Sequence, residues 1–139
     1  MVNRETLADG ATRLSSGGCA FVYKRPRAGV LHVAIAGDDA GQFGTTTLDE
    51  IIAAIQREHP LELFIDAREA VGVAVSVSDD WTRFFATHRA SFSRVHVLVG
   101  SKVVYLTVAI AQHLSRTGNL IQIYSDPEIF EQRLPAPSR

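Results

Sequence analysis

Residues 61–66 read Leu-Glu-Leu-Phe-Ile-Asp, a short apolar run rich in β-forming residues that ends in an acid. Similar runs occupy residues 30–36, 95–99 and 120–124, and segments with helical spacing separate them. Strands that alternate with helices of about ten to fifteen residues are typical of crossover connections between parallel strands. The sequence therefore predicts an α/β fold with a mixed, mostly parallel sheet of about five strands and about four helices.

The part of the chain before this pattern predicts an antiparallel hairpin. Residues 19–23 and 30–36 are both β-type runs, and Pro26 and Gly29 between them favour a reversal of the chain.

The two ends of the sequence have a different composition from the middle. Residues 1–18 mix polar and small side chains and end in Ser-Ser-Gly-Gly, so we expect a flexible leader there. Pro135 and Pro137 predict a disordered tail over residues 135–139. A single domain over residues 19–134 remains.

Three helix starts carry capping signals. Residues 47–50, Thr-Leu-Asp-Glu, fit a capping box, in which the threonine hydroxyl and the glutamate side chain satisfy free backbone amides. Ser101 predicts the start of a helix that runs to about Arg116, and Asp126 or Ser125 with Pro127 predicts a short final helix.

The helix predicted over residues 101–116 is apolar on nearly all sides. One stripe consists of Val103, Leu106, Ile110 and Leu114, and the residues Val104, Val108 and Ala111 lie on other sides. A helix of this kind must be buried on more than one face. The spare face is therefore expected to meet either a neighbouring helix or another subunit.

Composition and charge exclude several classes of protein. The chain has 139 residues, is 46% hydrophobic and 21% charged, and carries a formal net charge of -1, so neither nucleic acid nor an anionic membrane is an expected partner. Cys19 is the single cysteine and agrees with a reducing compartment. The most apolar stretch, residues 103–111, is too short to cross a bilayer. We expect a cytoplasmic protein without membrane insertion.

The acid that ends the run at 61–65 heads the first candidate site. Asp66, Arg68 and Glu69 follow this strand, and ligands of parallel sheets bind beyond the carboxyl ends of the strands. With Asp79 and Asp80 near the start of the next helix, they predict a partner- or ligand-binding loop. The alternative is a simple turn, in which Arg68 pairs with Asp66.

Serines supply the second and third candidate sites. Ser76 or Ser78 is expected to begin the next helix, where either is a helix cap or a phosphoacceptor, because helix amides favour the added negative charge. Ser101 and Lys102 stand where a phosphate loop would lie, but the glycine that a Walker loop needs is replaced by Val95. They remain a candidate anion site, with Ser101 as a helix cap as the alternative.

The remaining residues do not form a catalytic pattern. The five histidines lack the spacing of metal ligands, and no serine lies in a G-x-S-x-G elbow. We therefore predict no enzyme activity, no metal and no cofactor.

The order of elements resembles the STAS superfamily, the anti-sigma-factor-antagonist type, and its SpoIIAA-like relatives, over about residues 20–134. The resemblance lies in the hairpin, the loop Gly37-Asp38-Asp39, the acid-tipped strand 61–66, the helix that begins with Gly-Ser, and the stretch 117–124, Thr-Gly-Asn-Leu-Ile-Gln-Ile-Tyr. It implies a mixed sheet flanked by helices and a non-enzymatic role that consists of docking on a kinase, phosphatase or other regulatory partner.

In the family this docking is sometimes controlled by phosphorylation at the start of the second helix, within an Asp-Ser-Ser-Gly motif. Residues 74–79 here read Ala-Val-Ser-Val-Ser-Asp, so Ser76 is the nearest match to the phosphoacceptor and Ser78 the second. The acid before the serine and the glycine after it are absent.

Three functions follow, in order of preference. The first is a regulatory interaction module that docks on a signalling partner or associates with itself through the helix 101–116. The second is a carrier of a small ligand or lipid, because residues 71–77 are apolar for a connecting segment and could line a pocket. The third is an enzyme whose histidines and acids come together only in the fold.

Overall fold

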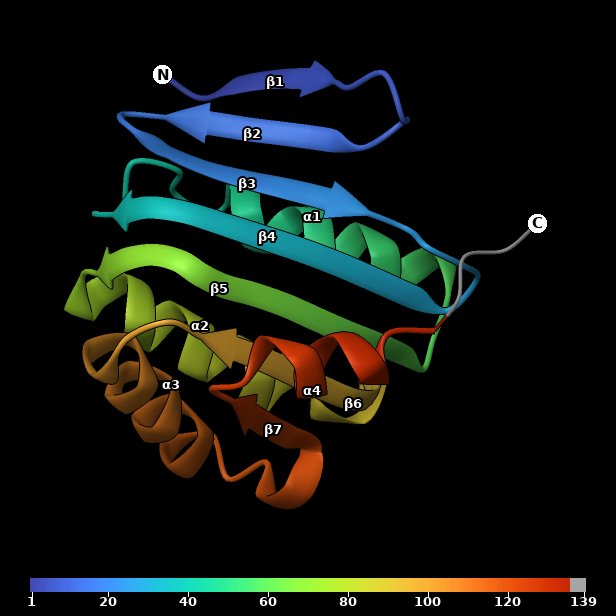
Figure 1. Cartoon of the computed structure of the whole chain (residues 1–139), viewed down its shortest axis with the longest axis vertical. Helices are drawn as coiled ribbons and strands as arrows, with labels where there is room; N and C mark the ends of the chain where they lie inside the picture. Colours follow the sequence, from blue (N-terminus) through green and yellow to red (C-terminus); the bar gives the residue numbers. More distant parts are fainter. Residues whose placement is uncertain (136–139) are drawn as a thin grey trace.

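The computed structural model describes residues 1–135, and these form a single sheet with helices on both faces (Figure 1). Seven strands lie in this part of the chain, and their order in the sheet follows their order in the sequence. The strands are β1 (Asn3–Thr6), β2 (Thr12–Ser16), β3 (Cys19–Lys24), β4 (Val30–Asp39), β5 (Leu61–Val73), β6 (Phe92–Val99) and β7 (Ile121–Tyr124). The four α-helices of this part are α1 (Thr46–Arg57), α2 (Val75–His88), α3 (Lys102–Leu114) and α4 (Pro127–Arg133).

The pairing confirms an α/β fold with a mixed sheet and an antiparallel β3–β4 hairpin. Strands β1 to β4 pair antiparallel, and β4 to β7 pair parallel. The prediction of about five mostly parallel strands is wrong, because residues 1–18 supply β1 and β2 instead of a flexible leader. All four residues of β1 are exposed, so this strand carries no apolar alternation that a sequence pattern could reveal. Of the predicted tail over 135–139, residues 136–139 lie outside the described residues.

The two faces of the sheet are covered unequally. Helices α1, α2 and α3 pack on one face and form the main core with side chains such as Leu63, Ile65 and Val97. Helix α4 lies on the other face (Figure 1), where Phe130 packs with Phe64 and Leu98 in a smaller core. Over the regular first part of β5, successive residues point to opposite faces, so Leu63 and Ile65 belong to the main core and Phe64 to the smaller one.

Two predicted helix starts are corrected by the structure. Thr45 precedes α1 in place of the predicted capping box at 47–50, because Thr47 is buried and Glu50 forms an ion pair with Arg4. Helix α2 begins at Val75, after Ala74, and not at Ser76 or Ser78. Neither helix start has a side chain that accepts a hydrogen bond from the first turn.

The other two helix starts are confirmed. The Ser101 hydroxyl accepts a hydrogen bond from the Val104 amide at 3.2 Å, and the Asp126 carboxylate accepts one from the Glu128 amide at 2.9 Å, with Pro127 in the first turn. Gly100, just before Ser101, has no room for a side chain, because a Cβ atom would stand 2.4 Å from the Arg68 carbonyl oxygen.

The predicted loop between β5 and α2 does not exist as a loop. Strand β5 continues to Val73, paired with β4 across two irregularities in register, and α2 follows two residues later. None of the helices in the described part of the chain is long and apolar enough to cross a membrane.

Candidate functional site

Helix α3 exposes a stripe of four large aliphatic side chains. Val103 is 65% exposed, and the exposed fractions of Leu106, Ile110 and Leu114 are 59%, 55% and 58%. The opposite side of the helix packs on the sheet, where Val104 and Ala111 are buried. The sequence left open whether a neighbouring helix or another subunit covers the spare face, and in the single chain this stripe remains open to solvent.

Two contacts show which way the stripe faces. The Gln112 side chain donates a hydrogen bond to the Ile121 carbonyl at 2.6 Å, so this side of α3 faces β7. Thr107 lies on the other side and shares the lining of a cavity with α2. Thr107 stands at the boundary between the buried and the exposed side of α3, because the exposed Val103 and Ile110 lie four positions before and three after it. The stripe therefore borders the groove between α2 and α3, and we call Val103, Leu106, Ile110 and Leu114 the α3 stripe.

The cavity between α2 and α3 is small and apolar. Its volume is about 90 Å³, it is partly open, and strands β4 to β7 form its floor. Phe85 and Trp81 of α2 and Ala111 of α3 line it, and Ser78 and Thr107 are the polar side chains in its wall. Of the apolar segment 71–77, Val73 lines this cavity, whereas Val71 and Val75 are 71% and 78% exposed.

The two predicted phosphoacceptors differ in accessibility. Ser76 is exposed in the first turn of α2, beside Asp80 and the buried Asp39 in a pocket of about 130 Å³. Burial raises the pKa of Asp39, although a hydrogen bond from the Gly41 amide opposes this effect. Ser78 is half-buried and lines the apolar cavity instead.

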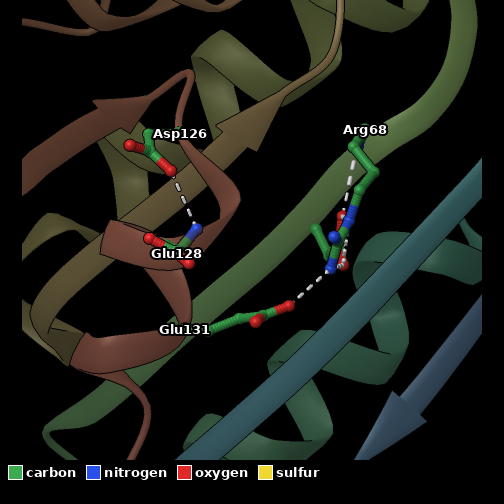
Figure 2. A network of polar contacts seen from close by, with 5 residues as sticks. Arg68, Asp126, Glu128 and Glu131 are labelled. Carbon is green, nitrogen blue, oxygen red and sulfur yellow. Dashed lines mark hydrogen bonds and ion pairs between the residues drawn. The ribbon is translucent and has the colours of Figure 1, made fainter.

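The acids and the arginine of the predicted loop divide between the two faces of the sheet. Asp66 and Arg68 lie within β5 on the α4 face, where the Arg68 guanidinium pairs with Asp66 at 2.8 Å and with Glu131 of α4 at 3.1 Å (Figure 2). The hydrogen bonds that the guanidinium donates to Asp66 and Glu131 raise the pKa of Arg68. Glu69 is exposed nearby in the chain, and Asp79 and Asp80 belong to α2 on the other face.

The candidate anion site remains a prediction. Ser101 and Lys102 are both exposed at the start of α3, but the Ser101 hydroxyl oxygen is already engaged by the Val104 amide.

A polar cluster on the α4 face was missed by the sequence analysis. His96 of β6 is 3% exposed, with its Nε2 atom 2.8 Å from Glu62 and its Nδ1 atom 2.8 Å from the Tyr124 hydroxyl. Its ring stacks on Phe64 with a centroid distance of 4.2 Å. Burial lowers the pKa of His96, although Glu62 opposes this shift. His96 is 34 positions from Glu62 and 28 positions from Tyr124 in the sequence, so no local sequence signal links the three residues.

Comparisons with known proteins bear on the fold. No protein-family model matches the sequence, and no curated protein matches it. Among solved structures, the chain is similar to an uncharacterized protein from the DUF3478 family with a SpoIIAA-like fold, from Shewanella loihica PV-4. The two share 20% sequence identity, the TM-score is 0.57, and the match covers 87% of this chain and 98% of the other.

The chain has a SpoIIAA-like fold. This confirms the fold that the resemblance to the STAS superfamily implied. The SpoIIAA-like sheet places the α3 stripe on the face that carries three helices and the Arg68 network on the face that carries α4.

Proposed function

We propose that this SpoIIAA-like chain is a non-enzymatic regulatory module that docks on a protein partner through the α2–α3 face. The α3 stripe carries this proposal. Four aliphatic side chains, each more than half exposed on one side of one helix, present on the order of 400 Å² of apolar surface. Patches of this size on soluble domains are frequently interaction sites.

A phosphorylation switch in the first turn of α2 would lie on one of the two helices of this docking face. Ser76 is exposed in the first turn of α2, where the helix dipole favours a phosphoryl group. Its exposure favours it over Ser78, whose side chain faces the apolar cavity. A phosphoryl group on Ser76 would lie near Asp80 and Asp39, so we expect repulsion to displace the start of α2 rather than to stabilise it.

Self-association through α3 is the closest alternative. The stripe runs Val-Leu-Ile-Leu along the helix, and a second copy could pair with it in the antiparallel direction. Such a homodimer would use the same side chains as a foreign partner, so the measured mass in solution separates the two cases.

The cavity favours a second candidate function only in part. Its apolar lining suits a nonpolar ligand, but ligand pockets usually measure about 300–1,000 Å³. At about 90 Å³ it cannot enclose an acyl chain unless α2 and α3 move apart. A lipid carrier therefore requires a more open form of the domain.

An enzyme stays the third candidate, and the Glu62–His96–Tyr124 cluster is the place to look for it. Both ring nitrogens of His96 are engaged and the ring is buried against Phe64. These contacts support a packing role, because the ring can exchange a proton with a substrate only after one of them breaks.

Photo-crosslinking in cells tests the docking proposal. The crosslinking amino acid p-benzoylphenylalanine is placed at position 110 in the α3 stripe and, as a matched control, at position 129. Ile129 is an aliphatic residue of α4 that is 46% exposed on the other face. We expect a discrete adduct from position 110 and none from position 129. Equal yields from both positions, or no adduct from position 110, would overturn the proposal.

A further inference from the structure

The volume of the cavity between α2 and α3 limits what can fill it. A cavity of about 150 Å³ accommodates a benzene molecule. The volume of about 90 Å³ here suits a smaller group, such as the branched end of a leucine or isoleucine side chain.

The lining of the cavity selects an apolar group over water. A buried water needs about two to four polar partners. Ser78 and Thr107 are the polar side chains in the wall, and the Thr107 hydroxyl already donates a hydrogen bond to the Val103 carbonyl of its own helix at 3.0 Å. An aliphatic side chain loses no hydrogen bond when it enters such a site. A water molecule would find too few hydrogen-bond partners there to replace those it has in solvent.

The cavity and the α3 stripe adjoin, so one partner can use both. Thr107 stands in the cavity wall, and Val103 and Ile110 lie one turn before and after it on the same side of α3. A helix in a groove binds in this way, with one anchor side chain in a pocket and its neighbours on a flat apolar surface.

The charges at the two ends of the groove differ, and this difference indicates which charge the partner should carry at each end. Arg89 follows α2, Arg116 follows α3, and the Arg89 guanidinium donates a hydrogen bond to the Arg116 backbone carbonyl at 3.1 Å, so both residues lie at the C-terminal end of the two helices. Arg116 and His113 line a shallow surface pocket at this end. His113 belongs to the last turn of α3 at this end. The stretch from residue 100 to 125 contains no acid. At the opposite end, Lys102 lies at the start of α3, and Asp79 and Asp80 lie near the start of α2. Asp80 forms an ion pair with Arg83, so the charges at this end nearly cancel.

A second copy of the chain fits this charge pattern poorly. In a parallel pair Arg116 would face Arg116, and in an antiparallel pair it would approach Lys102 as well as Asp79. A partner with acids at one end of its apolar face meets the basic end of the groove without this repulsion.

We infer that the α2–α3 groove binds an amphipathic helix of a protein partner, which inserts one branched aliphatic side chain into the cavity and sets acidic residues against Arg89, His113 and Arg116. This inference rests on the proposed docking function and names the partner of the same surface.

Synthetic helical peptides test it against the full chain by fluorescence anisotropy at physiological salt. The parent peptide is an amphipathic helix with a central leucine in its apolar face and glutamates at one end. One derivative replaces the central leucine by alanine, another by tryptophan, and a third replaces the glutamates by lysines. We expect the parent to bind, and each derivative to bind weaker by about tenfold or more.

Matched protein variants separate the cavity from the surface. Ala111→Leu fills the cavity from the buried side of α3, and Ala109→Leu adds the same group on the same helix at a residue that does not line the cavity. We expect Ala111→Leu to remove the preference for leucine over alanine and Ala109→Leu to retain it. If Ala111→Leu fails to fold, Ala70→Val fills the same cavity from β5.

The outcomes distinguish this inference from the docking proposal. The inference is overturned if no peptide binds, if leucine and alanine peptides bind equally, or if the lysine peptide binds best. Binding of the chain to phosphatidylcholine and phosphatidylglycerol vesicles that abolishes peptide binding would assign the groove to a membrane surface and also overturn it. A crosslinked adduct at position 110 would still support docking in each of these peptide results, whereas its absence removes both proposals.

Discussion

Phe130 anchors α4 to the sheet, and its replacement by alanine tests how that face is held together. Phe130 is 0% exposed and is the buried residue of this seven-residue helix. Its ring contacts Phe64 and Tyr124 with centroid distances of 5.8 and 5.7 Å. Complete burial of such a side chain stabilises a fold by about 1.5–3 kcal/mol, and the cavity left by Phe→Ala raises the usual cost to about 3–5 kcal/mol.

We expect Phe130→Ala to lower the free energy of unfolding by about 3 kcal/mol, at the low end of that range. The cost is limited because α4 is short and can leave the sheet without disturbing α1, α2 and α3 on the other face. For a chain of this size the loss corresponds to a fall in melting temperature of about 10 °C.

Urea unfolding followed by the fluorescence of Trp81 measures the loss. Trp81 is the single tryptophan and lies in α2 on the opposite face, so the substitution does not change its surroundings directly. Hydrogen exchange should show fast exchange in α4 while β5 and β6 stay protected. Ile129→Ala, in the same helix but 46% exposed, is the control and should cost less than about 0.5 kcal/mol. A loss below about 1 kcal/mol for Phe130→Ala, or equal losses for both variants, would refute the reasoning.

Four further outcomes are expected. Gly100→Ala should lower the urea midpoint, with a cost of about 1–3 kcal/mol, because the new Cβ atom would stand 2.4 Å from the Arg68 carbonyl oxygen; an unchanged midpoint would show that the backbone yields freely. Arg68→Met should cost no more than about 1 kcal/mol in the same assay, because the ion pairs in Figure 2 are partly exposed, and a larger loss would contradict this. Burial raises the pKa of Cys19 to about 11, so its thiol should not react with a disulfide reagent near pH 8 until the protein unfolds; rapid reaction of the folded chain would argue against this placement. Burial lowers the pKa of His96 in the fold, so protonation favours the unfolded chain, and stability should fall as the pH drops below about 6.5 toward the folded-state pKa; a His96→Gln variant should show a smaller fall.

Local sequence signals were enough to predict the centre of this fold. The runs at 30–36, 61–65 and 95–99 lie within β4, β5 and β6, because strands buried on both faces are apolar at nearly every position. Ser101 and Asp126 were predicted as caps because their side chains act on the adjacent turn and need no distant partner.

The errors arose where distant contacts decide the local structure. Strand β1 is polar and forms only by pairing with β2, so its sequence resembles a loop. The second half of β5 contains Arg68 and Glu69 and follows β4 through irregular register, which hides the alternation of a strand. Helix α2 begins after Ala74, which has no capping side chain. Capping signals therefore predict the helix start at Ser76 or Ser78, further along the chain.

The candidate site was visible from the sequence only in outline. The apolar character of α3 on all sides indicated a surface in need of a partner, but which side faces solvent depends on how α3 packs against β7 and α2. The cavity has no signature in sequence, because its wall combines residues of two helices and four strands. The same is true of the Glu62–His96–Tyr124 cluster, which joins three strands.

The sheet adds its strands in the order in which the chain is synthesised. Each strand after β1 pairs with the strand that precedes it in the sequence, so none has to be inserted between two strands that formed earlier. A ribosome-bound chain could therefore extend the sheet step by step, with α1, α2 and α3 each covering the strands just completed. We expect a nascent chain that has emerged from the ribosome as far as β6 to resist proteases in β2 to β5 already, before β7 and α4 have emerged.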